Sequence, residues 1–334
     1  MSPIDRLNEF PRFPLAYLPT PLVPLARLSA RLGGPRLMIK RDDCTGLAFG
    51  GNKARKLEFL VADAVQQGAT RLVTEGGLQS NSVRQTAAAA IRAGLKCTLI
   101  LNENVDWHEP AYRESGNLML DRLLGADIVF CDKDTPRADV YPGVMEDLVR
   151  AGEKPYFIPT GGSNALGSLG YALCAFELIE QAKAQDITIH HVVFASASGG
   201  TQGGFLAGLR AAGSAIRCHG IDIENDVAAV RELVVPIAAE TGALLGVADR
   251  DESDVLIHGG YAAPAYGMPN DGMRAAVQLL ARTEAILLDP VYSGKGMAGM
   301  LGLIEKGAFT ADETVVFIHT GGTPALFGYT SLFG

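Results

Sequence analysis

Short apolar segments rich in β-branched residues alternate with helical patterns along nearly the whole chain. The segments expected to form strands are 37–39, 71–74, 97–101, 128–130, 156–158, 192–195, 218–221, 255–257 and 315–318. The segments expected to form helices, from their periodicity and alanine content, are 52–67, 80–93, 116–124, 166–182, 201–212 and 270–281. This alternation predicts a mainly parallel sheet covered by helices on both faces.

The loops that follow the predicted strands carry most of the paired glycines and hydroxyl side chains. In parallel sheets, ligands bind at the carboxyl ends of the strands, where loops lead into helix N-termini. The loops at these ends are 50–53, 75–81, 160–164, 196–202, 291–296 and 319–323. We therefore expect the functional site to be built from these six loops.

One of these loops ends in a lysine at the start of a predicted helix, in the sequence GGNKARKLEF of residues 50–59. The partial positive charge of a helix N-terminus disfavours a further cation in that position. Lys53 is therefore either a ligand for an anion or an amine that takes part in chemistry.

The loop SASGGT, residues 196–201, runs from an apolar strand into a helix. Its glycines permit close approach of a ligand, and the free N–H groups and dipole of the helix favour an anion. Its hydroxyl side chains add donors, so the loop is interpreted as a phosphate cup. It has neither the lysine of a P-loop nor the GxGxxG of a dinucleotide fold, and an ordinary glycine-rich turn is the simpler alternative.

The loop EGGLQSN, residues 75–81, offers more polar side chains than helix capping alone requires. Gln79, Ser80 and Asn81 are consequently expected to bind a carboxylate. Tyr292 and Thr320 lie in two further loops, where each is weak evidence alone, and His319 is expected to be structural. A lysine, a phosphate cup and a carboxylate loop together indicate pyridoxal 5'-phosphate, held as a Schiff base.

Composition and charge narrow the remaining possibilities. The 334 residues are 48% hydrophobic, and the net charge is −8 with no basic tract, so neither nucleic acid nor an anionic membrane is expected as a partner. The five cysteines are scattered and form no metal-binding or disulfide pattern, which favours a reducing cytoplasm. No signal peptide or membrane-spanning run is recognised.

The chain resembles the fold-type II pyridoxal-phosphate enzymes, the tryptophan synthase β-like group. Within this group it is similar to the branch of D-cysteine desulfhydrase, L-cysteate sulfo-lyase and 1-aminocyclopropane-1-carboxylate (ACC) deaminase. The motifs that carry the resemblance are LPTPLVPLARLSARLGG, IKRDDCTGLAFGGNKARKLEF, GGLQSNSVRQTAAAA, LLDPVYSGKGMAG and FIHTGGTPALF. The resemblance implies an α/β fold of two open, twisted parallel-sheet domains with the cofactor between them. Residues 1–53 plus 164–334 would form the large domain and residues 54–163 a small inserted one, in a homodimer.

The resemblance also implies roles for individual residues. Lys53 would form the Schiff base and move the α-proton, with Ser80, Tyr266 and Tyr292 as further catalytic residues. The cofactor would be held by Asn52, Asn81 near the phenolic oxygen, Ala197, Ser198, Gly199, Gly200 and Thr201 at the phosphate, Ser293 at the pyridine nitrogen, and Thr320. The substrate, a small anionic amino acid, would contact Gln79, Ser80, Asn81, Tyr266 and Tyr292.

The identity of two side chains bears on the substrate. The deaminase branch would carry Glu at the Ser293 position and an apolar residue at the Thr320 position. Ser293 and Thr320 therefore favour sulfur-releasing elimination over ring opening, and the expected activity is that of a carbon–sulfur lyase acting on D-cysteine. The loop beginning at Cys44 resembles the cysteate lyases, which keeps L-cysteate as an alternative. Ser82 stands where both groups would have histidine. ACC deamination, a racemase or dehydratase, and a non-catalytic ligand-binding homologue rank behind.

Overall fold

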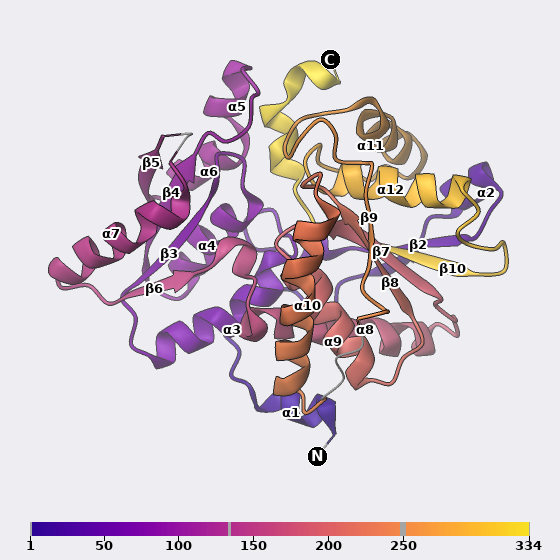
Figure 1. Ribbon diagram of the computed structural model, residues 1–334, viewed down its shortest axis with the longest axis horizontal. Coiled ribbons are helices and arrows are strands. Elements are labelled where there is room, and N and C mark those ends of the chain that lie inside the picture. Colours follow the sequence, from indigo (N-terminus) through magenta and orange to yellow (C-terminus); the bar gives the residue numbers. More distant parts are fainter. Residues whose placement is uncertain (1, 133–134, 248–251, 334) are drawn as a thin grey trace.

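The computed structural model describes residues 2–132, 135–247 and 252–333, which form two sheets with helices packed around them (Figure 1). In the view of Figure 1 the smaller sheet lies on the left and the larger one on the right. None of the helices among the described residues combines the length and hydropathy needed to cross a membrane.

The larger sheet has six strands in the order β1-β2-β10-β7-β8-β9. These are β1 (Leu22–Pro24), β2 (Arg36–Lys40), β10 (Thr314–Ile318), β7 (His191–Ser196), β8 (Arg217–Asp222) and β9 (Leu256–His258). Only β1 pairs in the antiparallel sense, and the sequence pattern did not predict it, because it is a three-residue edge strand that ends in proline. Strand β2 near the N-terminus pairs with β10 near the C-terminus, so this sheet is built from both ends of the chain.

Both faces of the larger sheet are covered, as the uninterrupted apolar strands predicted. On one face Met38, Val192 and Phe194 pack against α8 (Ala165–Ala184), α9 (Gly200–Ala211) and α10 (Val227–Leu244). On the other face Ile39 and Val193 pack against α2 (Ala26–Leu32), α11 (Asp271–Glu284) and α12 (Ser293–Glu305). Neighbouring residues of one strand thus enter opposite cores, which follows from the two-residue repeat of a strand.

The smaller sheet is wholly parallel, with the order β5-β4-β3-β6. Its strands are β5 (Asp127–Cys131), β4 (Lys96–Asn102), β3 (Arg71–Gly77) and β6 (Pro155–Ile158). The helices between them and before them are α3 (Lys53–Gln66), α4 (Asn81–Arg92), α5 (Pro110–Glu114), α6 (Gly116–Leu123) and α7 (Arg137–Arg150), while α1 (Pro3–Glu9) opens the chain. Short 3-10 helices are η1 (Asp42–Cys44), η2 (Thr160–Gly162), η3 (Thr323–Gly328) and η4 (Thr330–Leu332).

All nine predicted strands and all six predicted helices are present, with ends shifted by up to three residues. The prediction of a loop over 291–296 was partly wrong, because α12 already begins at Ser293. The sequence analysis also did not single out α7 or α10, each of which contains a proline inside the helix. The domain boundaries near residues 53 and 163 stay a prediction.

Candidate active site

The loop before Lys53 is held in a conformation that only glycine adopts easily. Gly50 and Gly51 have φ angles of 66° and 129°, and a Cβ on Gly50 would lie 2.1 Å from the carbonyl oxygen of Asp43. The next residue, Asn52, donates its backbone N–H to the Thr320 carbonyl at 2.9 Å. These constraints fix the start of α3, so that Lys53 is its first residue.

The amine of Lys53 faces a cavity of about 750 Å³. The cavity lies at the carboxyl ends of strands from both sheets, lined among others by residues after β3, β6, β7 and β10. Burial lowers the pKa of Lys53 to about 8, with Arg84 adding to this effect and Asp289 opposing it. Such an amine is neutral often enough near pH 7 to act as a nucleophile or a base.

Most of the predicted site residues line this cavity, although they come from loops far apart in the sequence. They are Asn52, Lys53, Ser80, Asn81, Ala197, Ser198, Thr201, Tyr266, Tyr292 and Thr320. Four predicted residues, Gln79, Gly199, Gly200 and Ser293, are not among those that line it.

The loop after β7 has the shape of a cradle that side chains would fill. A Cβ on Gly200 would lie 2.6 Å from Ser163 Oγ and 2.8 Å from Lys56 Nζ. The buried hydroxyl of Ser196 has no hydrogen-bond partner among the described residues, and Gly199 has a φ of 80°. Gly199 and Gly200 thus shape the cradle from behind rather than lining the cavity, and the first N–H groups of α9 are placed to bind an anion.

A second lysine lies behind this cradle. Lys56 is completely buried, and its amine donates to the carbonyl oxygen of Gly161 at 3.1 Å and to Ser163 Oγ at 3.2 Å. Burial and the nearby charge of Lys53 place its pKa well below the ordinary value. The sequence analysis gave Lys56 no role, although its spacing of three residues from Lys53 places both on one side of α3.

The carboxylate loop divides its side chains between the cavity and the protein interior. Ser80 lines the cavity and also caps α4, because its Oγ accepts a hydrogen bond from Val83 N–H. Gln79 instead donates to the carbonyl oxygens of Tyr112 and Ser115 and accepts from Asn117 N–H. Both sides of the Gln79 amide are therefore bonded within the protein, and Gln79 is not among the residues that line the cavity.

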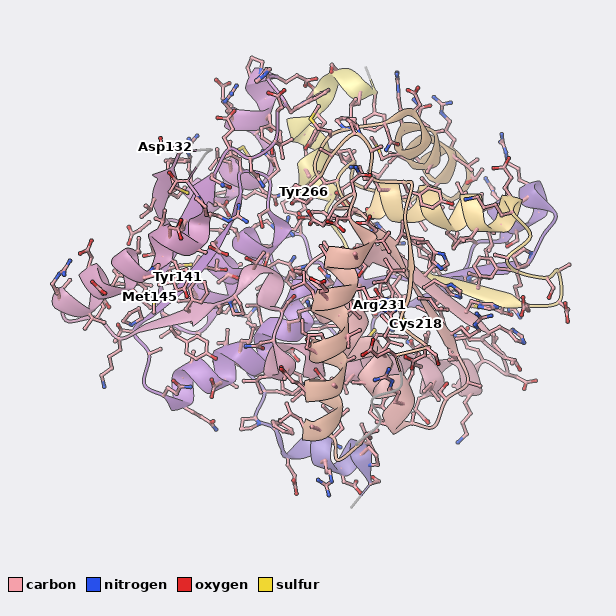
Figure 2. The ribbon with its side chains drawn as sticks, in the orientation of Figure 1. Asp132, Tyr141, Met145, Cys218, Arg231 and Tyr266 are labelled. Carbon is pink, nitrogen blue, oxygen red and sulfur yellow. The ribbon has the colours of Figure 1, made fainter. Side chains whose placement is uncertain are left out.

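Two tyrosines face each other across one wall of the cavity. The hydroxyls of Tyr266 and Tyr292 are hydrogen-bonded, and their rings meet edge to face with centroids 5.8 Å apart. Burial raises the pKa of both phenols, so both stay protonated at neutral pH and can donate hydrogen bonds. Figure 2 labels Tyr266 and also Tyr141, which lines the same cavity from α7.

Ser293 is buried at the start of α12 and is bonded within its own turn. Its Oγ donates to a carboxylate oxygen of Asp289 at 2.5 Å and accepts from Asp289 N–H at 2.9 Å. The same carboxylate accepts the backbone N–H groups of Val291, Tyr292 and Ser293. Thr320, on the neighbouring loop, lines the cavity directly.

Helix α7 contributes a cation that the sequence analysis missed. Arg137 lines the cavity, donates to Asn102 Oδ1, and has its Nε 3.9 Å from a carboxylate oxygen of Glu75. The other oxygen of Glu75 accepts from Thr160 Oγ1 at 2.6 Å. Only the fold reveals this group, because Arg137 lies far along the chain from the predicted site residues, with the loop at 160–164 the nearest of the predicted loops.

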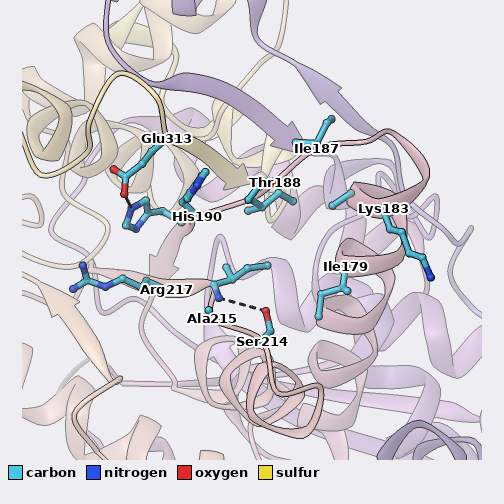
Figure 3. A pocket seen from close by; sticks show the side chains of 13 residues that line it. Ile179, Lys183, Ile187, Thr188, His190, Ser214, Ala215, Arg217 and Glu313 are labelled. Atoms are coloured by element: carbon cyan, nitrogen blue, oxygen red, sulfur yellow. Dashed lines mark hydrogen bonds and ion pairs between the residues drawn. The ribbon is translucent and has the colours of Figure 1, made fainter.

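A second cavity of about 500 Å³ lies at the amino ends of β7, β8 and β10, the opposite end of the larger sheet (Figure 3). Its wall is largely aliphatic, from Ile179, Ile187 and Ile216, with Arg217 and Glu313 at its edge. Among the described residues that line it, none belongs to the first turn of a helix in the manner of α9. The cradle and Lys53 therefore make the first cavity the candidate active site.

The residues present fit pyridoxal 5'-phosphate on chemical grounds. An amine of lowered pKa, a glycine cradle at a helix N-terminus and an orphaned buried hydroxyl supply what an aldehyde bearing a phosphate requires. His319 takes no part, because its ring bonds the Leu287 carbonyl oxygen at 2.9 Å and Gly321 N–H at 3.2 Å, as expected for a structural residue.

Residues 14–321 match the family described as pyridoxal-phosphate dependent enzyme, and the chain belongs to this family. Within it, the chain is 44% identical to proteins named 1-aminocyclopropane-1-carboxylate deaminase from Burkholderia vietnamiensis (strain G4) and from Burkholderia cenocepacia (strain J2315). Each match covers 98% of this chain and 98% of the relative. The predicted cofactor, pyridoxal 5'-phosphate, is thereby confirmed.

Solved structures agree with this placement. A crystal structure described as an ACC deaminase homologue superimposes with a TM-score of 0.89 at 33% identity, covering 99% of this chain and 97% of the other. A crystal structure of a threonine deaminase superimposes with a TM-score of 0.65 at 18% identity, covering 91% of this chain and 92% of the other, which speaks for the fold alone. The predicted fold type II and the resemblance to the ACC deaminase branch are both confirmed.

Proposed function

We propose that this protein is a β-eliminating carbon–sulfur lyase, acting as a D-cysteine desulfhydrase. One molecule each of D-cysteine and water would yield pyruvate, ammonia and hydrogen sulfide. The Cα–H and Cβ–S bonds break, and the aminoacrylate that is released hydrolyses in water. The observation that carries this proposal is the side chain at position 293.

Position 293 holds a neutral hydroxyl where the resemblance places the partner of the pyridine nitrogen. In the structure Ser293 does not line the cavity and its hydroxyl donates to Asp289, so this role requires the hydroxyl to turn from Asp289 to the nitrogen. A neutral partner does not hold that nitrogen protonated as a carboxylate would. This favours a reaction in which a good leaving group departs as the α-proton is removed.

Pyridoxal 5'-phosphate, when bound, supplies the electron-withdrawing ring that makes the α-proton of an amino acid acidic. Lys53, with a pKa of about 8, is suited to accept that proton. Ser80 and the N-terminus of α4 would orient the substrate carboxylate. The Tyr266 and Tyr292 hydroxyls bond each other, so the one whose proton is not used in that bond would donate to the departing sulfur.

A second candidate substrate, L-cysteate, is favoured by one observation. A sulfonate needs a cation or several donors, and Arg137 supplies a cation in the cavity wall. Its pairing with Glu75 is long, at 3.9 Å, so the guanidinium retains donors for another anion. L-Cysteate and water would give pyruvate, ammonia and sulfite.

The deciding experiment compares three substrates with one preparation of the cofactor-loaded protein. D-Cysteine, L-cysteate and ACC, the compound in the relatives' name, are supplied in parallel. Pyruvate, sulfide, sulfite and 2-oxobutanoate are quantified, with Lys53→Ala as the background control. We expect pyruvate and sulfide from D-cysteine.

Pyruvate with sulfite from L-cysteate alone would replace the first candidate by the second, and Arg137→Gln should then reduce that activity. Production of 2-oxobutanoate from ACC without pyruvate from either sulfur compound would overturn both. A purified protein that stays colourless with added cofactor would favour a ligand-binding protein without catalysis.

We also propose a homodimer and the two-domain division of the chain near residues 53 and 163. Tyr17 and Phe49, with 72% and 63% of their surface exposed, are large apolar side chains of the kind that subunit contacts cover. Light scattering at micromolar concentration tests the dimer. A monomeric mass would refute it without touching the proposed reaction.

A further inference from the structure

Arg84 joins three segments around the candidate active site. It lies on α4, is completely buried, and donates to Asn81 Oδ1 at 3.0 Å and to Asn117 Oδ1. Its second terminal nitrogen donates to the carbonyl oxygen of Gly50 at 2.8 Å. One guanidinium thus links the start of α4, the start of α6 and the loop that leads to Lys53.

This contact fixes which way the Asn81 amide points. A guanidinium only donates, so the atom of Asn81 that faces Arg84 must be the oxygen. Asn117 Nδ2 donates to the same oxygen at 3.0 Å and to the carbonyl oxygen of Gln79 at 2.9 Å, which fixes the Asn117 amide as well. The amide nitrogen of Asn81 donates to no acceptor among the described residues, although Asn81 lines the cavity.

We propose that Arg84 is a positioning residue that turns the Asn81 amide so that its N–H donors face the cavity. The group they would meet is an anionic oxygen on an aromatic ring, which in this family's cofactor is the phenolic oxygen. Through Gly50, the same side chain sets the distance between this donor and Lys53. The role belongs to cofactor binding and does not depend on which amino acid is the substrate.

The surroundings of Arg84 strengthen its effect on the site. The carboxylate whose charge acts most strongly on Arg84 is that of Asp121. Its two oxygens have no hydrogen-bond partner among the described residues. Burial raises the pKa of Asp121 to about 8, against the opposing charge of Arg84. That charge acts on Lys53 as well, where it favours the neutral amine, against the opposing charge of Asp289.

Two substitutions test whether the Asn81 amide donor, and not merely a folded protein, is needed at this position. Arg84→Met removes the fork that holds the Asn81 oxygen. Asn81→Asp keeps an oxygen toward Arg84 and Asn117, so the network persists, but it replaces the cavity donor by an acceptor. Arg71→Met is the matched control, because Arg71 is also a buried arginine, bonded to Thr98 and Asp127 at the far end of β3.

The measurements use no amino-acid substrate, so they can fail independently of the proposed reaction. The dissociation constant of pyridoxal 5'-phosphate is measured on cofactor-free protein, and the visible absorbance of the loaded protein is titrated with pH. Loss of a donor to the phenolic oxygen raises the pKa of that oxygen. Arg84→Met and Asn81→Asp should both raise the titration midpoint and weaken cofactor binding about tenfold or more.

Arg71→Met should change neither quantity. Unchanged midpoint and affinity in Arg84→Met would overturn the proposal, as would an Asn81→Asp protein that binds and titrates like the original. If Arg84→Met does not fold, Arg84→Lys takes its place. Arg84→Lys should restore only part of the effect, because an ammonium keeps the charge but lacks the planar fork that reaches three oxygens.

Discussion

Substituting glutamine for His219 should make the protein more resistant to acid. His219 is the middle of a chain of hydrogen-bonded rings across the larger sheet, 3.0 Å from His191 and 2.9 Å from His258. His191 in turn lies 3.1 Å from a carboxylate oxygen of Glu313, at the edge of the cavity in Figure 3. Burial lowers the pKa of His219 to about 3, and the two neighbouring rings and Arg217 lower it further by smaller amounts. Glu313 acts in the opposite direction.

The sign and size of the effect follow from this pKa. An unfolded histidine titrates near 6.5, so below that pH the unfolded state binds a proton while His219 in the folded state stays unprotonated. The contribution of the neutral His219 to the free energy of unfolding is complete above about pH 6.5 and is lost as the pH falls toward 3. Each pKa unit corresponds to about 1.4 kcal/mol, so the loss at pH 5 is about 2 kcal/mol and at most about 5 kcal/mol near pH 3.

The assay is urea unfolding at pH 7 and pH 5 with saturating cofactor, comparing the original protein with His219→Gln. Glutamine can hydrogen-bond both neighbouring rings but does not titrate. Between pH 7 and pH 5, the free energy of unfolding of the variant should fall by about 2 kcal/mol less than that of the original protein. His108→Gln is the control, because the His108 side chain is 72% exposed. Equal losses in the original protein and in His219→Gln would refute the reasoning.

Three further predictions concern the candidate active site. Lys53→Ala should lose the covalent visible chromophore, and a chromophore still fixed by borohydride would exclude Lys53 as its attachment point. Gly200→Ala should weaken cofactor binding at least tenfold, because its Cβ would lie 2.8 Å from Lys56 Nζ; Gly143→Ala, in open space on α7, is the control for adding a methyl group and should bind normally. Lys56→Met should weaken binding of pyridoxal 5'-phosphate by about tenfold but leave binding of pyridoxal, which has no phosphate, unchanged; an equal loss for both compounds would contradict a role at the phosphate.

Much of the candidate site was predictable from the sequence because its signals are local. Paired glycines after a strand, a lysine at a helix start and hydroxyls beside glycines each involve a few adjacent residues. The carboxyl-end rule of parallel sheets then brings such loops together without knowledge of the packing. Lys53, Asn81 and Thr201 were found in this way, and all three line the same cavity.

Which face a polar side chain takes was not predictable, because it depends on partners far away in the chain. Gln79 and Ser80 are neighbours in one loop, yet Gln79 is bonded to the segment around Tyr112 and only Ser80 lines the cavity. Arg137 entered the cavity wall through α7, which the sequence analysis did not single out.

The sequence by itself determined nine of the ten strands and six of the helices among the described residues, together with most loops around the cavity and the family, because hydrophobic periodicity and glycine placement act over a few residues. Only the tertiary structure decided that Arg84 orients the Asn81 amide and that three histidines on adjacent strands form one chain. Both arrangements arise from the register of elements that the sequence separates by tens of residues. Buried hydrogen bonds need a partner within about 3 Å, and only the packed fold fixes which groups reach that distance.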